Sequence, residues 1–132
     1  MKKQICILLA LLCATVCSIG VFADSILVPL WDNVQVVDVQ IDFSDTNGSA
    51  AAKMREDSLS AKFTGKLAVY RKVGSGWIFV DHVYDTSANG VLALHLDFTG
   101  TSGTAYKAEL TATATLNGDS EPISKTAYKT CP

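Results

Sequence analysis

The sequence contains few of the residues on which catalysis and metal binding depend. Only two histidines, His82 and His95, occur in 132 residues. Cysteine occurs four times, but Cys6, Cys13 and Cys17 all fall in an apolar N-terminal stretch. No cofactor-binding motif and no nucleophile elbow is present. We therefore expect no cofactor, no metal and no catalytic residue.

The N-terminus has the three parts of an export signal peptide. Lys2 and Lys3 carry positive charge, residues 5–16 are apolar and uncharged, and Val21-Phe22-Ala23 suits a cleavage site. Cleavage there leaves residues 24–132 as a single secreted domain. An uncleaved membrane anchor is the open alternative.

The chain after position 23 has little positive charge and one cysteine. Nine basic residues face thirteen acidic ones, a formal charge of −4. This sign, without a basic run, argues against nucleic acid or an anionic membrane as partner. Cys131 has no intradomain partner, so a disulfide-linked dimer, a reactive thiol and an inert thiol in a frayed tail all remain open.

The clearest pattern in the chain is a two-residue alternation between positions 106 and 116. Apolar side chains share one face, at Tyr106, Ala108, Leu110, Ala112, Ala114 and Leu116. Lysine, glutamate and threonine side chains occupy the positions between them. This period predicts a β-strand with one buried and one wet face.

Similar alternation predicts further strands, over residues 37–43, 59–64, 66–73, 77–85, 92–98 and 122–128. Asn-Gly pairs at 47–48, 89–90 and 117–118, and Gly74-Ser75-Gly76, predict tight turns between them. Residues 50–56 have high helix propensity, but no apolar stripe continues from them, so we expect extended structure. The chain is therefore predicted to be an all-β, antiparallel β-sandwich of seven or eight strands.

Part of this pattern resembles a known domain. Leu67-Ala68-Val69-Tyr70-Arg71, Trp77, Gly103-Thr104-Ala105-Tyr106 and Asn117-Gly118-Asp119-Ser120-Glu121-Pro122 are similar to the second half of a fibronectin type III or related immunoglobulin-like domain. The resemblance implies that Tyr106 forms a tyrosine corner, its hydroxyl bonded to backbone upstream. The whole chain also resembles an uncharacterised family of small secreted proteins of Gram-positive bacteria, which implies fold and compartment only.

Two sets of polar residues could have a chemical role, one in catalysis and one in calcium binding. If residues 77–85 and 91–98 form a hairpin, Asp81 lies opposite His95, as a small secreted hydrolase would need. An exposed charge pair explains the same residues. Asp42, Asp45 and Asn47 are oxygen ligands of the kind calcium uses, but their spacing fits a hairpin turn better than a calcium loop.

Aromatic residues supply the remaining candidates. Trp31, Trp77, Tyr70, Tyr84 and Tyr128 could form a flat binding face, but for Trp77 and Tyr70 core packing is the favoured interpretation. Trp31 and Tyr128 are the candidate binding residues. The sequence thus favours a secreted, non-catalytic protein that acts outside the cell by binding or by structural association, with an unknown protein or glycan as its partner. A hydrolase and a secreted antagonist or toxin-like factor are the alternatives.

Overall fold

The computed structural model describes residues 31–132, which form one unit. The predicted signal peptide and its cleavage site lie outside the described residues. Between Trp31 and Pro132, no helix is long and apolar enough to cross a membrane.

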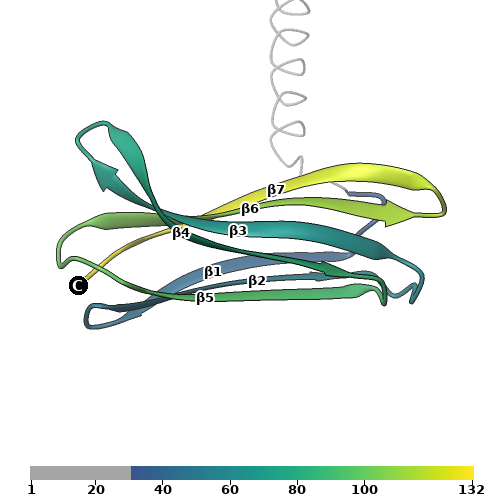
Figure 1. Cartoon of the computed structure of the whole chain (residues 1–132), viewed down its shortest axis with the longest axis horizontal. Helices are drawn as coiled ribbons and strands as arrows, with labels where there is room; N and C mark the ends of the chain where they lie inside the picture. Colours follow the sequence, from purple (N-terminus) through teal and green to yellow (C-terminus); the bar gives the residue numbers. More distant parts are fainter. Residues whose placement is uncertain (1–30) are drawn as a thin grey trace, which may run out of the picture. The chain divides into compact units, whose positions relative to one another are not determined.

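Two antiparallel sheets make up this unit. Its strands are β1 (Val36–Ser44), β2 (Asn47–Arg55), β3 (Lys62–Val73), β4 (Gly76–Ser87), β5 (Val91–Thr99), β6 (Ala105–Leu116) and β7 (Asp119–Thr130). One sheet has the order β1-β2-β5 and the other β4-β3-β6-β7. Figure 1 shows the sheets as two stacked layers. The predicted antiparallel sandwich of seven or eight strands is confirmed, with seven strands in the described residues, and residues 50–55 are extended, as expected.

Burial of alternate residues creates the core between the layers. In β6, the side chains of Tyr106, Ala108 and Leu110 are buried, whereas Thr111 and Thr113 point to solvent. The largest buried side chains come from both sheets and include Tyr106, Phe63, Met54, Leu67 and Leu110. Removal of this apolar surface from water is the main stabilising contribution, because the described residues contain no disulfide.

Hydrogen bonds join the two layers along one edge. Lys125 Nζ of β7 donates to the backbone oxygen of Val37 in β1 at 2.6 Å. Lys129 Nζ lies 2.9 Å from Asp42 Oδ1, again between β7 and β1. These long side chains cover the core at an edge where the sheets share no backbone pairing.

The entry of the chain into the sandwich is fixed by one carboxylate. The Glu121 side chain accepts hydrogen bonds from the backbone nitrogens of Asp32, at 3.1 Å, and Asn33, at 2.9 Å. The Asn33 amide in turn donates to Asp119 O at 2.9 Å. The start of the described chain is therefore tied to the β6–β7 hairpin.

The three Asn-Gly pairs have different structures. Asn117 and Gly118 form the predicted hairpin turn, both with positive φ. Asn47 and Gly48 lie inside β2 instead, and the turn falls at Asp45 and Thr46. The turn prediction for this pair was wrong because Gly48 serves close packing: a Cβ there would come within 2.5 Å of the Phe98 ring.

The third pair, Asn89-Gly90, connects strands of different sheets. β4 pairs with β3, and β5 pairs with β2, so the hairpin considered for residues 77–85 and 91–98 does not form. Gly90 has φ of 79° and joins the layers through a hydrogen bond from its nitrogen to Ala61 O. The glycine does adopt a turn conformation, but it turns the chain from one layer into the other.

Some strand boundaries also differ from the prediction. Leu59, expected in a strand, lies in the preceding loop with 79% of its surface exposed. β7 begins at Asp119 and continues to Thr130, beyond the predicted 122–128. The β6–β7 pairing extends from Leu116–Asp119 to Ala105–Thr130, and this long register lengthens the last strand.

Candidate functional site: an aromatic face on the four-stranded sheet

The outer face of the β4-β3-β6-β7 sheet carries a cluster of aromatic rings. Strand register places Phe79, Tyr70, Lys107 and Tyr128 in one row across the four strands. At the usual spacing of strands, such a row is about 14 Å wide. Trp77 lies in the adjoining row, opposite Lys72. We call Tyr70, Trp77, Phe79, Tyr84 and Tyr128 the aromatic face.

The rings contact one another in two pairs. The ring centroids of Tyr70 and Phe79 are 5.9 Å apart in an edge-to-face arrangement. Those of Trp77 and Tyr128 are also 5.9 Å apart, at 51°, although the two residues belong to the outermost strands of the sheet. The Trp77 indole therefore reaches across the strands between β4 and β7. Both centroid distances lie in the range at which aromatic pairs attract each other, and the Tyr70–Phe79 pair also has a preferred orientation.

Lys107 lies at the centre of this cluster. Its Nζ is 5.0 Å from the Tyr70 ring centroid and 5.1 Å from that of Trp77. Only 17% of its side chain is exposed, and Glu109 Oε2 lies 3.4 Å from the ammonium group. A cation over two ring faces is attracted by their negative quadrupoles. Lys107 thus orients Tyr70 and Trp77 relative to each other.

A bulge in β4 sets the orientation of its side chains. The β3–β4 register shifts between Val69 and Tyr70, which leaves Val80 as an extra residue in β4. Beyond it, Phe79 and Trp77 lie on the outer face and Ile78 on the other. Figure 1 shows the tip of this hairpin bending away from the three-stranded sheet, and Ile78 accordingly has no core to enter and is 45% exposed.

The predicted aromatic residues divide into two groups. Tyr70, Trp77 and Tyr128 come together, and Tyr84 lies further along β4 on the same face. Trp31 is elsewhere, half-buried against the core. Core packing, the interpretation favoured by the sequence for Tyr70 and Trp77, is wrong, because their register directs them away from the other sheet.

One residue of the aromatic face, Phe79, was missed by sequence reasoning. It is 53% exposed and contacts both Tyr70 and His82, whose ring centroid is 5.6 Å away. Residues 77–80 are apolar on both sides, so alternation alone gave no indication of which side faces solvent. The signal that could have found it is the bulge, which a single sequence does not display.

The hypothetical Asp81–His95 pair is absent. His95 Nε2 instead lies 2.9 Å from Asp97 Oδ1 on the same strand, and both side chains are more than 60% exposed. The Asp81 carboxylate accepts a hydrogen bond from the backbone nitrogen of its neighbour His82. The pair fails because β4 and β5 belong to different sheets.

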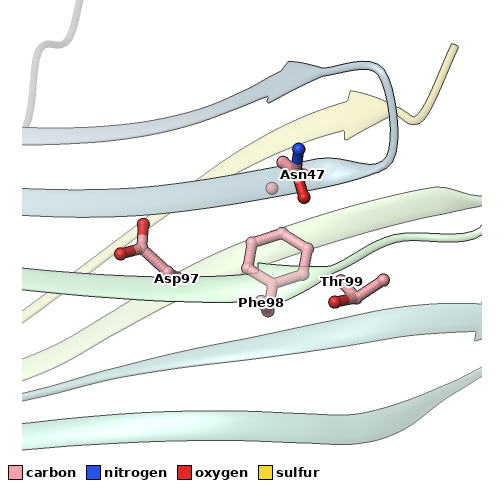
Figure 2. A pocket seen from close by; sticks show the side chains of 5 residues that line it. Asn47, Asp97, Phe98 and Thr99 are labelled. Carbon is pink, nitrogen blue, oxygen red and sulfur yellow. The ribbon is translucent and has the colours of Figure 1, made fainter.

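The three residues considered and rejected as calcium ligands, Asp42, Asp45 and Asn47, have separate roles in the structure. Asp42 pairs with Lys129, and Asp45 lies in the β1–β2 turn with φ of 53°. Asn47 lines a shallow hollow beside Gly48, Asp97, Phe98 and Thr99, shown in Figure 2. From Trp31 to Pro132, no three histidine, cysteine or acidic side chains gather as a metal site would require. These residues are explained by the hairpin turn between β1 and β2, which Asp45 and Thr46 form.

Cys131 and Tyr106 occupy the same end of the sandwich. Cys131 is 1% exposed, and its backbone bonds to Thr104 O and Gly103 N, so the frayed-tail interpretation is wrong. A disulfide to a second chain would require this end of the sandwich to open. The Tyr106 hydroxyl accepts a hydrogen bond from the backbone nitrogen of Thr101 at 2.8 Å.

Comparison with known proteins adds little to this geometry. No family model and no curated protein matches the chain. Among solved structures, it is similar to a β-glucuronidase of Parabacteroides merdae, at 14% identity and a TM-score of 0.43, over 74% of this chain and 14% of that one. A protein from Archaeoglobus fulgidus is similar at 12% identity and a TM-score of 0.32, over 74% of this chain and 96% of that one. Likenesses this weak carry no argument about function.

Proposed function

We propose that this chain is a secreted, non-catalytic binding protein whose aromatic face holds a glycan or protein partner. The observation that carries the proposal is the exposure of large rings on one sheet face: Phe79, Tyr84 and Tyr128 are each more than half exposed. Aromatic rings provide wide, stiff contact surfaces that stack on sugars and anchor protein partners. Export of the chain rests on the signal peptide predicted at residues 1–23.

We also infer that the sandwich is of the immunoglobulin-like, fibronectin type III-like kind. Support comes from the division into three and four strands and from the Tyr106 hydroxyl, which bonds backbone five residues upstream. A bond of this form defines the tyrosine corner of that family. Such domains commonly occur outside cells as binding modules, in agreement with the proposed role.

The binding proposal is tested with the double variant Phe79→Ala/Tyr128→Ala of residues 24–132. Both side chains are exposed, so their removal changes stability by at most about 1 kcal/mol. The matched control is Leu59→Ala/Val91→Ala, which removes two exposed apolar side chains elsewhere. Each protein is screened against immobilised polysaccharides and extracellular proteins. We expect the aromatic variant alone to lose at least about tenfold in affinity. If the aromatic variant and the control variant bound the same partner with equal affinity, the proposal would be contradicted.

A further inference from the structure

We infer that the ligand of the aromatic face is an acidic polysaccharide, a chain of sugar rings that carry carboxylates. This inference rests on the proposed binding function and names its ligand class. Two features of the face carry it: an excess of positive charge, opposite in sign to the chain after position 23, and a row of side chains that extends across all four strands.

Positive charge is concentrated on the outer face of the four-stranded sheet. Register places Lys62, Lys66, Lys72 and Lys107 on this face, and Glu109 is the one acidic side chain among the described residues there. The chain after position 23 has a formal charge of −4, so the face is opposite in sign to the molecule. An anionic partner is attracted to this surface and repelled by the remainder.

Most of this charge is available to a ligand. Lys62, Lys66 and Lys72 are exposed and form no salt bridge with any residue from 31 to 132. Lys72 Nζ lies 6.0 Å from the Trp77 ring centroid, and Lys66 is opposite Tyr84. A sugar ring stacked on Trp77 or Tyr84 would therefore place a carboxylate substituent within reach of an ammonium group.

The shape of the face favours a polymer. The hollows lined by Asn47 and Asp97, and by Asp32 and Glu121, lie away from the aromatic face. The row from Phe79 to Tyr128 crosses all four strands and has an exposed ring at each end. Exposed rings on separate strands can contact successive sugars of an extended ligand, whereas sites for small molecules are usually concave.

Nucleic acid has similar chemistry, since its bases stack on aromatic rings and its phosphates attract lysine. It is disfavoured by the remaining surface, because a chain of net charge −4 repels the dense charge of a phosphate backbone. A sugar polymer with one carboxylate per ring or fewer has a lower charge density than duplex DNA, which carries one charge per about 1.7 Å of its axis, whereas a single strand is similar to such a polymer in charge. A single-stranded oligonucleotide is therefore included as a competitor in the test.

The test uses residues 24–132 and two pairs of polymers matched in backbone. Polygalacturonate is compared with its methyl-esterified form, and carboxymethylcellulose with methylcellulose. Affinity is measured by calorimetry in low and high salt for the wild type, Lys66→Met/Lys72→Met and the control Lys53→Met. Lys53 is an exposed lysine on the other sheet, and methionine preserves most of the side-chain length in each variant.

We expect at least one acidic polymer to bind at least about tenfold more tightly than its neutral partner, with the difference reduced by salt. The Lys66→Met/Lys72→Met variant should lose this preference while still binding, and Lys53→Met should keep it. Equal affinity for acidic and neutral forms would overturn the charge inference but leave the aromatic binding function in place. Absence of binding to all four polymers, or tighter binding of the oligonucleotide, would overturn the polysaccharide assignment. The screen of Phe79→Ala/Tyr128→Ala against extracellular proteins, described above, then decides separately whether the aromatic face binds proteins.

Discussion

At the scale of single residues, Tyr106 combines burial with a specific hydrogen bond. Its side chain is 1% exposed, and its ring contacts Phe43 and Phe98 at centroid distances of 5.3 and 5.4 Å. The hydroxyl accepts the Thr101 N–H, which joins the β5–β6 loop to the core. Tyr106 therefore fixes both the interior of the sandwich and the loop that enters β6.

Replacement of Tyr106 by phenylalanine isolates the hydrogen bond. The ring remains, but the half-buried Thr101 N–H loses its acceptor, so we expect a loss of about 1 to 2 kcal/mol in the free energy of unfolding. Urea denaturation monitored by circular dichroism measures it. The control is Tyr128→Phe, which removes a hydroxyl from an exposed ring and should change stability by less than about 0.5 kcal/mol. Equal losses would show that the Tyr106 hydroxyl has no special role.

A similar prediction concerns Glu121, whose carboxylate holds the start of the described chain. Glu121→Ala leaves the Asp32 and Asn33 nitrogens without their carboxylate, and we expect a loss of about 1 to 2 kcal/mol. Hydrogen exchange should accelerate at residues 32–34 before it does so in β6. The exposed pair Arg55–Asp57 supplies the control, since Asp57→Ala should have little effect. Unchanged exchange at residues 32–34 would contradict the proposed anchoring.

At the scale of strands, Gly48 tests the close approach between β2 and two aromatic rings. A Cβ at Gly48 would lie 2.5 Å from Phe98 and 2.9 Å from Phe43, so the rings must shift. Gly48→Ala should destabilise the domain by about 1 to 3 kcal/mol. Gly76→Ala is the control, because its nearest contact would be at 3.8 Å and its φ is not positive. Thermal unfolding of both variants provides the measurement, and similar melting temperatures would contradict the packing.

Strand identity was predictable from alternation, but strand pairing was not. β6 follows a two-residue period because one side faces the core along its whole length, so its residues could be assigned to faces from sequence. The Asn89-Gly90 pair has the local conformation of a turn, yet which strands it joins depends on the pairing of β4 with β3. That pairing is a long-range property, and local sequence does not contain it.

The residues of the candidate site were likewise predictable only in part. Tyr128 was predicted as a binding residue because its position near the chain end made exposure plausible, and it is 67% exposed. Trp77 and Tyr70 were assigned to the core by residue type alone, since large aromatic side chains are usually buried in a small domain. Tyr70 points outward because Val69 of β3 is buried, whereas the outward position of Trp77 arises from the bulge at Val80, which depends on tertiary structure.

At the scale of the whole molecule, the reactivity of the Cys131 thiol measures how often one end of the sandwich opens to solvent. Residues 24–132 contain this one cysteine, and its thiol is buried beside Asp45 O. We expect a thiol reagent such as Ellman's reagent to react only at the rate of unfolding, and with one equivalent in denaturant. Non-reducing electrophoresis should show a monomer. Rapid reaction of the native protein would contradict the buried position and support a disulfide-linked dimer.

The charge of the whole molecule and that of the aromatic face differ in sign, and this contrast connects the fold to the proposed ligand. Placement of four lysines on one side of a sheet, with most acidic residues elsewhere, requires the register of β3 with β4 and β6. The β4 bulge then adds Trp77 and Phe79 to the same side. Binding should therefore be confined to this face of the sandwich.

The most direct measurement is acrylamide quenching of Trp77 fluorescence during titration with polygalacturonate. The variant Trp31→Phe leaves Trp77 as the single tryptophan, and Trp77→Phe, in which Trp31 reports, is the control. We predict saturable protection of Trp77 from acrylamide and no change at the half-buried Trp31. If the polymer bound but acrylamide quenched Trp77 as strongly as before, binding at the aromatic face would be contradicted.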